Sequence, residues 1–337
     1  MRLGLAVGYW GRRPPQDHLV PLVQEAERLG YHSVWTSEAW GSDAFTPLTW
    51  IAAHTSTVEL GTAIVQMAAR APAATAMHAL TLDHLSGGRL TLGLGLSGPQ
   101  VVEGWYGRPF PKSPLTATRE YVSVIRSALG SNRPLTQEGR YYGLPYTGDD
   151  GTGLGKALRP AVNPLRRSIP IFLGAEGPKN IAQTAAIADG WLPLYWSPER
   201  ADVYADSLRQ APADFRIAPM VYARLCDDPE PALFQVKAMI SFYVGGMGAK
   251  GANFHADLMA RMGFASEVAK IQELFLDGRP DESIESVPTE FANEISLVGP
   301  RERIAERLAA FRESGVTDLL ITSKDLPTLR LLAELAL

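Results

Sequence analysis

Two carboxylates, Glu38 and Asp43, follow the short apolar run Ser33–Thr36 and are the first residues in the chain whose type suits chemistry. If that run is a strand of a parallel barrel, both side chains lie at its carboxyl end, where barrel enzymes carry their active sites. A carboxylate there can move a proton if burial raises its pKa towards neutrality. Asp43 also suits the cap of a helix that begins near Pro47, so both roles stay open for it.

Two glycine-rich segments indicate that the backbone approaches a ligand or another part of the chain closely. Residues 93–98 have the spacing G-x-G-x-x-G, but a dinucleotide fold needs a helix to begin directly afterwards. Because Pro99 and further glycines follow, we expect the next helix only near Thr116, which disfavours a Rossmann domain. Residues 174–178 place proline in an expected first helical turn, where free backbone N–H groups can bind an anion; a plain tight turn is the alternative.

Several other catalytic signatures are missing from the sequence. The six histidines form neither an H-x-H pair nor an H-E-x-x-H helix, so we expect no metal site. Neither a G-x-S-x-G elbow nor a Walker loop occurs. The single cysteine, Cys226, excludes an intramolecular disulfide and is typical of a small buried apolar residue.

The composition is that of an ordinary globular enzyme. Of 337 residues, 46% are hydrophobic and 20% are charged, which supplies enough apolar material for a large core. The formal net charge of −4 disfavours a nucleic-acid binder, whose surface is usually basic. The apolar N-terminal run is too short for a signal sequence, and no run reaches the roughly 18 residues that a membrane helix needs. We therefore expect a cytoplasmic protein without a membrane partner.

Short apolar runs alternate with segments of helical periodicity, which is typical of parallel β/α units. The expected strands are residues 3–7, 33–36, 59–65, 90–95, 169–173, 191–195, 217–225 and 318–322. Helices are expected to begin near Pro14, Pro47, Pro72, Thr116, Pro178 and Pro300. This order favours a single (β/α)8 TIM barrel over residues 1–337, with an open doubly wound sheet as the alternative.

Two stretches exceed what eight β/α units need, residues 131–168 and 227–294. The first is rich in Gly, Pro and Tyr, and the second contains helical runs at 232–244 and 264–275. Long connections between a strand and the following helix overhang the carboxyl-terminal mouth of a barrel. We therefore expect both insertions at the mouth, with the second shaping the substrate pocket.

Several segments, taken in order, resemble the bacterial luciferase-like family of flavin and deazaflavin oxidoreductases. They are residues 60–64, 81–89, 92–95 and 169–175 together with 188–191, and the resemblance covers nearly the whole chain. Residues 97–107 are similar to an actinobacterial subgroup that uses coenzyme F420. The resemblance implies a luciferase-like TIM barrel that transfers a hydride between this deazaflavin and a small organic substrate, and it implies a homodimer.

The resemblance also implies which residues contact the coenzyme. The ring system and ribityl chain are expected at Glu38, Ala63, Ile64, Gln66, Ser97 and Gly98. The phosphate is expected on the backbone of Gly174, Ala175, Glu176, Gly177 and Pro178. Many members of the family have a non-proline cis peptide bond at the position of Ala63 and Ile64.

Two residues depart from the sugar-phosphate dehydrogenase branch of the family. Ala39 stands where that branch has a histidine near the hydride-transfer centre, and Pro99 stands where it has a glutamate at the substrate. Glucose 6-phosphate is therefore not the expected substrate, and Glu38 and Asp43 remain the candidates for moving a proton. The expected walls of the substrate pocket are Trp10, Trp40 and Trp105, for which ordinary packing is the alternative.

Four basic residues are expected on loops near the mouth: Arg12, Arg13, Arg108 and Lys112. They could receive the anionic oligoglutamate tail of the coenzyme, and ordinary solvated charges are the alternative. Two other functions also fit the sequence. One is an FMN-dependent monooxygenase that uses O2 and reduced flavin on the same barrel, and the other is a non-catalytic protein that binds a flavin or a fatty ligand.

Overall fold

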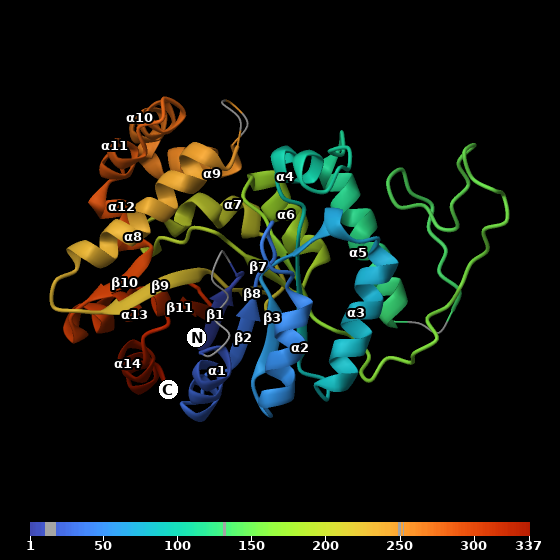
Figure 1. The fold of residues 1–337 in the computed structure, drawn as a ribbon, viewed down its shortest axis with the longest axis horizontal. Coiled ribbons are helices and arrows are strands. Elements are labelled where there is room, and N and C mark those ends of the chain that lie inside the picture. Colours follow the sequence, from blue (N-terminus) through green and yellow to red (C-terminus); the bar gives the residue numbers. More distant parts are fainter. Residues whose placement is uncertain (11–17, 131–132, 249–250, 252) are drawn as a thin grey trace.

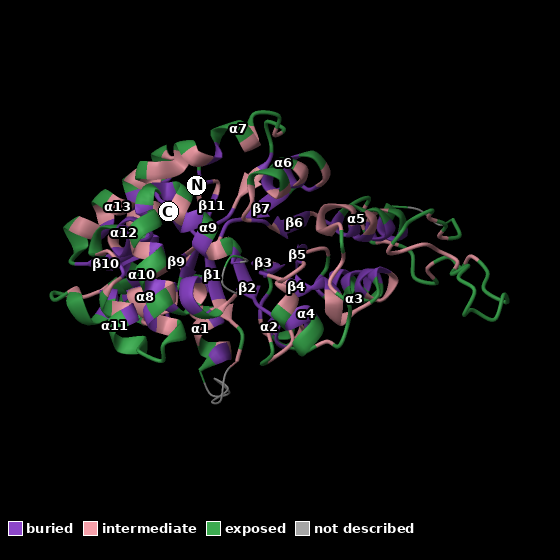
Figure 2. Cartoon of the chain, turned by 90° about the horizontal axis from the view of Figure 1, so that it is seen from above, coloured by how far each residue is buried: buried purple, intermediate pink, exposed green. Residues whose placement is uncertain are grey.

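A curled parallel sheet forms the centre of the molecule. The computed structural model describes residues 1–10, 18–130, 133–248, 251 and 253–337. Helices surround the sheet (Figure 1), and seen from above the strands curl around a common axis with the helices outside them (Figure 2). The sheet is therefore curled, unlike the open doubly wound alternative.

Every paired strand in the described sheet runs parallel to its neighbour. The strands are β1 (Arg2–Gly8), β2 (Ser33–Thr36), β3 (Glu59–Thr62), β4 (Val65–Gln66), β5 (Leu90–Gly95), β6 (Ile171–Gly174), β7 (Gly190–Leu192), β8 (Arg216–Ile217), β9 (Met220–Leu225), β10 (Ser296–Gly299) and β11 (Asp318–Thr322). Their order is β10-β9-β11-β1-β2-β3-β5-β6-β7-β8, with β4 paired to β5. Only Ala218 and Pro219 separate β8, which pairs with β7, from β9, which pairs with β11. This bent segment therefore joins the two sides of the sheet.

The helices begin largely where prolines predicted them. They are α1 (Leu19–Arg28), α2 (Phe45–His54), α3 (Pro72–Leu85), α4 (Pro99–Gly104), α5 (Pro114–Gly130), α6 (Pro178–Ile187), α7 (Ala205–Leu208), α8 (Glu230–Ser241), α9 (Phe254–Met259), α10 (Ala265–Leu276), α11 (Pro280–Glu285), α12 (Thr289–Glu294), α13 (Arg301–Glu313) and α14 (Leu326–Ala336). Four further segments are 3-10 or π-helical: η1 (Met67–Ala69), η2 (Pro198–Tyr204), η3 (Phe242–Gly246) and η4 (Ala260–Phe264). No helix in the described ranges is both long and apolar enough to cross a membrane.

Two sequence-based expectations about these elements are wrong. The sequence predicted no helix between the glycine motif and Thr116, but a helix begins at Pro99. Proline presets the first helical turn there, and Val101 and Val102 are buried. The second wrong expectation concerns Cys226, which was predicted to be buried and is only partly buried. The region of Pro14 lies outside the described residues, and the first described helix begins at Leu19.

Aromatic side chains fill the inside of the curled sheet. Trp35 of β2 is fully buried, and its ring lies 5.7 Å from the ring of Phe172 on β6. A side chain at Gly61 on the neighbouring strand would meet the Trp35 ring at 2.1 Å, so glycine is needed there. The packed interior makes the sheet a rigid support for side chains at its rim.

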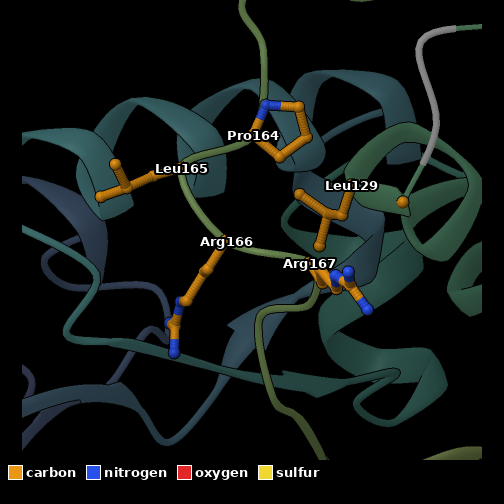
Figure 3. Close-up of a pocket in the computed structure, with 6 residues that line it drawn as sticks. Leu129, Pro164, Leu165, Arg166 and Arg167 are labelled. Carbon is orange, nitrogen blue, oxygen red and sulfur yellow. The ribbon is translucent and has the colours of Figure 1, made fainter.

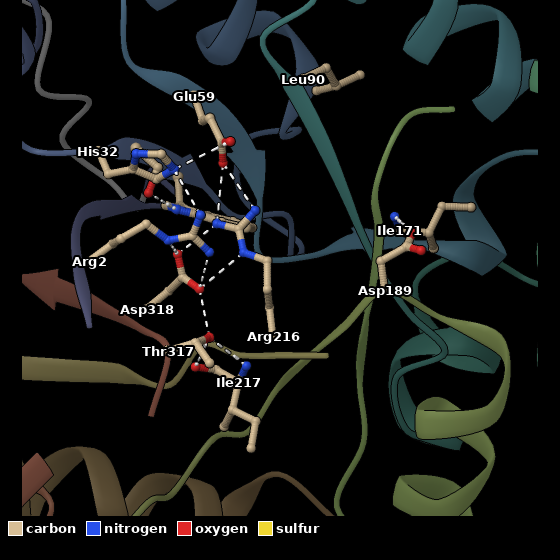
Figure 4. Close-up of polar contacts among 12 residues, drawn as sticks. Arg2, His32, Glu59, Leu90, Ile171, Asp189, Arg216, Ile217, Thr317 and Asp318 are labelled. Carbon is tan, nitrogen blue, oxygen red and sulfur yellow. Dashed lines mark hydrogen bonds and ion pairs between the residues drawn. The ribbon is translucent and has the colours of Figure 1, made fainter. Parts of the chain in front are cut away.

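A network of charges lies at the amino ends of the strands. Arg216, the first residue of β8, contacts Asp318 of β11 at 2.6 Å and Glu59 of β3 at 3.2 Å. Arg2 of β1 contacts the same Asp318 at 2.9 Å (Figure 4). Because these residues begin their strands, the network connects β1, β3, β8 and β11 at the end of the sheet opposite the carboxyl-terminal mouth.

The first insertion does not lie over the mouth, contrary to expectation. It follows α5 and precedes β6, so it connects a helix to the next strand and begins at the amino ends of the strands. Arg166 at its base contacts Asp83 at 2.7 Å, and beyond that base the segment projects past α5 (Figure 1). A cavity of about 510 Å³ at this base is lined by Leu129, Gly130, Pro164, Leu165, Arg166 and Arg167 (Figure 3).

The second insertion does cover part of the mouth. It forms α8 to α12, and its η4 turn contacts the loop that follows β6. The contact is a hydrogen bond of 2.6 Å from the Arg261 guanidinium to the main-chain oxygen of Glu176. In Figure 1, α9 accordingly lies at the same end of the molecule as α4 and α6, which follow β5 and β6.

Candidate functional site

Glu38 lies immediately beyond β2 and is held by an ion pair that the sequence did not predict. Its carboxylate is 3% exposed and accepts two hydrogen bonds from the Arg70 guanidinium, at 2.8 and 2.9 Å. The backbone N–H groups of Ala44 and Gln66 reach the same carboxylate at 3.2 and 3.3 Å. Both oxygens are therefore occupied, which fixes the position of the Glu38 carboxylate.

Tyr106 is a second residue at this pair that sequence reasoning missed. Burial, and then the charge of Glu38, raise the pKa of Tyr106 to about 12. Its hydroxyl therefore stays protonated at neutral pH and can donate a hydrogen bond towards the Glu38 side of the mouth. Arg70 belongs to no recognisable motif, and Tyr106 lies in the segment 97–107 that carries the resemblance without having been singled out there, so the fold is what brings both to Glu38.

The turn after β3 contains the non-proline cis peptide that the resemblance implied, between Ala63 and Ile64. The Ile64 carbonyl accepts a hydrogen bond of 3.0 Å from the Glu38 N–H, which ties this turn to the ion pair. Gln66 donates from its side chain to the Glu38 carbonyl at 3.2 Å, while its own Oε1 is buried without a partner. An unpaired buried acceptor is costly, so this oxygen is suited to receive a donor from a ligand.

The glycines of β5 are needed because the turn after β3 packs onto them. A Cβ at Gly93 would lie 1.8 Å from the Thr62 carbonyl oxygen, and one at Gly95 would lie 1.9 Å from Ile64 Cδ1. The close backbone approach that these glycines predicted is therefore made to another part of the chain. Beyond β5, Ser97 has φ of +66°, and Gly98 caps α4. A non-glycine residue in that conformation is uncommon and often occurs at functional sites.

The loop after β6 has the form of an anion site. Gly177 caps α6 and Pro178 occupies its first turn. The carbonyls of Ala175 and Glu176 are occupied by Trp191 and Arg261. In the part of the chain that the structure describes, the N–H groups of Gly177 and Lys179 have no hydrogen-bond partner. Free N–H groups at a helix start attract anions, with the helix dipole adding to the effect.

A cluster of buried polar side chains lies beside that loop and was not predicted. Glu176 Oε1 lies 3.6 Å from Nδ1 of His255 on α9, and the His255 ring packs edge-on against Tyr243. Glu176 Oε2, His255 Nδ1 and the Tyr195 hydroxyl are all buried without a hydrogen-bond partner. The cluster combines the ends of β6 and β7 with the second insertion, so no local pattern in the sequence could indicate it.

The remaining predicted residues occupy different surroundings. Asp43 accepts hydrogen bonds from Thr46 N–H at 2.9 Å and from its hydroxyl at 3.0 Å, which is the capping arrangement at the start of α2. The backbone N–H of Trp10 donates to Ser42 Oγ at 2.8 Å, so the loops after β1 and β2 meet. Trp40 is 42% exposed, and Trp105 at the end of α4 is 61% exposed.

The basic residues predicted for the coenzyme tail are only partly described. Arg12 and Arg13 lie outside the described residues. Arg108 and Lys112 are exposed in the loop between α4 and α5. Within the described ranges, no three His, Cys, Asp or Glu side chains are grouped in a way that could hold a metal ion.

Comparisons with known proteins identify relatives over nearly the whole chain. The model of the luciferase-like monooxygenase family matches residues 5–318. A protein of Mycobacterium tuberculosis named as a coenzyme F420-dependent oxidoreductase is 48% identical, over 99% of each chain. The solved F420-dependent tetrahydromethanopterin reductase of Methanopyrus kandleri superposes with a TM-score of 0.76 at 22% identity, covering 99% of this chain and 97% of that one. A solved F420-dependent secondary alcohol dehydrogenase gives 0.73 at 19% identity, with coverage of 99% and 97%. The chain therefore belongs to the luciferase-like monooxygenase family.

Proposed function

We propose that this protein is an F420-dependent oxidoreductase that transfers a hydride between the deazaflavin coenzyme and a small organic substrate. The observation that carries the proposal is the 48% identity over 99% of the chain to a relative named for F420 dependence. The site geometry supports it, because the residues expected at the ring, the ribityl chain and the phosphate follow β2, β3, β5 and β6 at one end of the sheet.

The proposal includes an eight-unit barrel. Three features of the sheet support that count. β4 continues β3 after the cis turn, and β8 and β9 form one bent strand. β10 pairs only with β9, so it is counted as an addition to the ring of strands and not as a member of it. Grouped in this way, the strands occupy eight positions around the axis. The expected site residues then lie at the carboxyl-terminal mouth, as in other barrels of this class.

The residues present fit the coenzyme. The unpaired Gln66 Oε1 suits a donor on the pyrimidine edge, and the free N–H groups of Gly177 and Lys179 suit a phosphate. When bound, the deazaflavin supplies or accepts the hydride at its C5 position. The protein supplies position and a site shielded from water, which are the usual contributions of a cofactor enzyme.

Within this proposal, Glu38 and Arg70 have a positioning role. Their pair holds the Ile64 turn through the Glu38 N–H and holds Gln66 through two further bonds. Asp43 remains the candidate for moving a proton, since the cap engages only its Oδ2. If Glu38→Gln and Asp43→Asn both keep full turnover, neither residue carries the proton.

The first test is a titration of the purified protein with F420 and FMN in parallel, followed by tryptophan fluorescence. We expect F420 to bind with micromolar or tighter affinity and FMN to bind more weakly. Preference for FMN would support the monooxygenase alternative, and binding of neither would contradict the proposal. Tight binding of F420 without turnover of any acceptor would favour a non-catalytic protein.

The predicted homodimer and cytoplasmic location belong to the same proposal. Sedimentation velocity at several protein concentrations tests the dimer, which is expected to show twice the chain mass of 36.6 kDa. A monomer at all concentrations would contradict it. Fractionation of the producing cells tests the location.

A further inference from the structure

We propose that His255 exchanges a proton with the substrate during hydride transfer, and that Glu176 and Tyr195 are the positioning residues that hold its imidazole ring. The inference rests on the proposed function and deepens it, because it names the proton partner and the substrate class. That class is an alcohol or the matching carbonyl compound, since removing a hydride from a carbon that bears a hydroxyl also releases the hydroxyl proton.

The two ring nitrogens of His255 have different surroundings. Nδ1 is buried and lies 3.6 Å from Glu176 Oε1. Nε2 has no hydrogen bond within the described residues and is not buried, so it is accessible. In a histidine that acts as a general base, a carboxylate fixes the ring through one nitrogen while the other nitrogen takes or gives the proton. Glu176 and His255 have this arrangement.

Three buried polar atoms beside this ring lack partners and complement one another. They are Glu176 Oε2, His255 Nδ1 and the Tyr195 hydroxyl. Burial, and then the charge of Glu176, raise the pKa of Tyr195 well above its ordinary value, so its hydroxyl stays a donor at neutral pH. The carboxylate therefore has one donor available for each of its two oxygens.

A small approach of α9 towards the loop after β6 would satisfy these atoms. The separation of 3.6 Å between Glu176 Oε1 and His255 Nδ1 is longer than a hydrogen bond. Unpaired buried polar atoms are costly, so shortening this distance is favourable. Hydrogen bonds between catalytic groups are often long in the free protein and shorten once the ligand is bound.

The pair lies at the mouth, beside the turn proposed to contact the coenzyme ring. A Cβ at Gly174, two residues before the carboxylate, would lie 3.5 Å from Ile64 Cγ2. On the other side, the His255 ring packs edge-on against Tyr243 with ring centres 5.0 Å apart. Burial, and then the charge of Tyr9 after β1, raise the pKa of Tyr243 to about 12. Residues that follow β1, β3 and β6 therefore surround the pair.

The charges at this place allow the histidine to change its protonation state. The Arg261 guanidinium donates a hydrogen bond of 2.6 Å to the main-chain oxygen of Glu176. The carboxylate therefore has a positive neighbour whether or not the imidazole is protonated. The two residues that act near this step in the sugar-phosphate dehydrogenase branch are replaced here by Ala39 and Pro99, so a proton partner elsewhere in the mouth is required.

The proposed step balances in both directions. When an alcohol is oxidised, its O–H bond breaks and the proton passes to His255 Nε2, while the carbon gives its hydride to the deazaflavin and the C=O bond forms. The alcohol loses two electrons and the coenzyme gains the same two. In reverse, the imidazolium returns the proton to the carbonyl oxygen as the carbon receives the hydride. Solvent exchanges the proton on His255 between turnovers.

The first test examines His255 without any substrate. Diethyl pyrocarbonate acylates accessible neutral imidazoles, and mass spectrometry of the peptides locates each modified histidine. We expect His255 to react in the free protein, and on the order of tenfold more slowly with F420 at about 100 times its Kd, where about 1% of the sites are empty. His54 in the last turn of α2 is the control and should react equally with and without F420.

The same reaction, followed between pH 5 and pH 8, reports the protonation of His255. We expect the midpoint of its pH dependence to move about one unit or more to lower pH in Glu176→Gln, because the imidazolium loses its carboxylate partner. Tyr195→Phe should move the midpoint to higher pH, because the carboxylate then loses a competing donor. A general disturbance of the fold would not produce shifts in opposite directions. The other titratable or charged groups around His255, none of them altered in these variants, are Tyr9, Tyr204, Tyr243, Asp257 and Arg261.

Turnover supplies the third measurement. A panel of primary and secondary alcohols, aliphatic and aromatic, is screened for reduction of F420 by the wild type, His255→Gln and Asp43→Asn. We expect His255→Gln to lower kcat by about 100-fold or more and to remove the acid limb of the pH profile, without a change in the thermal midpoint. Asp43→Asn should retain that limb.

The outcomes separate this inference from the proposed function. If F420 binds but does not slow the modification of His255, or if Glu176→Gln leaves the midpoint unchanged, the pair only fastens α9 to the barrel and the inference is wrong. It is also wrong if Asp43→Asn, and not His255→Gln, removes the acid limb, or if protein that binds F420 oxidises no alcohol of the panel. If the wild type does not bind F420, the proposed function itself fails.

Discussion

At the residue scale, the site depends on one buried ion pair. Arg70 donates two hydrogen bonds to Glu38, and its guanidinium also lies 5.5 Å from the ring centre of Phe45. The pair costs desolvation energy that an apolar pair would not, so its presence is poor evidence for stability alone. It is better explained by the fixed geometry that it imposes on the turn after β3.

We expect Arg70→Met to lower the free energy of unfolding by about 3–5 kcal/mol, because it leaves the Glu38 carboxylate buried without its cation. The double variant Arg70→Met with Glu38→Gln should recover much of that loss. Urea unfolding of the wild type, both single variants and the double variant measures the coupling. A loss in the double variant equal to the sum of the two single losses would show that the pair is not energetically coupled.

The sequence predicts part of the site at this scale. Glu38 could be identified because it follows a recognisable strand, and Gln66 because the family resemblance covers its position. Arg70 follows the short η1 turn, and His255 lies in the second insertion, so neither has a local signal. Their partners are 32 and 79 residues away in the chain, and side chains so far apart meet only through the tertiary fold.

At the scale of elements, the contact between β3 and β5 requires glycine. We expect Gly93→Ala to destabilise the protein by more than 2 kcal/mol, at the severe end for a single substitution, because its Cβ would overlap the backbone at Thr62. The matched control is Gly104→Ala in α4, where a Cβ meets nothing within 4 Å. That change should be neutral or should stabilise by up to about 1 kcal/mol. Similar midpoints of thermal unfolding for the two variants would contradict the close contact.

The elements themselves were largely predictable, for identifiable reasons. Ser33–Thr36, Leu90–Gly95 and Asp318–Thr322 match their predicted bounds, because each is a compact apolar run between turn residues. The six-residue α4 was missed, since the glycines and prolines in and around it outweighed two buried valines. The first insertion was wrongly predicted to lie at the carboxyl-terminal mouth. Connections from a strand to the next helix lie at that mouth, but this insertion connects a helix to the next strand.

At the scale of the whole molecule, the charge network at the amino ends of the strands links distant parts of the chain. Burial acts to raise the pKa of Asp318, but its hydrogen bond to Arg216 and the nearby charges hold that pKa below its ordinary value. The same balance of burial against His32 and Arg216 lowers the pKa of Glu59. The stabilisation from both carboxylates is therefore present above their unfolded pKa values, near 4, and is lost as the pH falls through the lower folded values.

We expect the free energy of unfolding to fall steeply as the pH is lowered below about 5. Asp318→Asn should show a flatter fall over the same range and a lower stability at pH 7. Urea unfolding at intervals between pH 3 and pH 7 measures both slopes. Identical slopes for the variant and the wild type would show that Asp318 does not contribute to the acid sensitivity.

The part of the first insertion that projects beyond the barrel should be cut before any other region. Leu154 is 84% exposed there, and residues 147–156 form neither helix nor strand. We expect limited digestion with a broad-specificity protease to cleave within 147–156 first and to leave the thermal midpoint of the nicked protein nearly unchanged. Early cleavage within α8 to α12 instead would show that the second insertion opens more readily.

The adjacency of the first and last strands of the barrel has a consequence for rearranging the chain. β1 pairs with β11, and both views place the two ends of the chain close together (Figures 1 and 2). A circular permutant could therefore join these ends with a short linker and open the chain within residues 147–156. Its new termini would leave from the flank of the molecule, away from the strand ends proposed to hold the coenzyme.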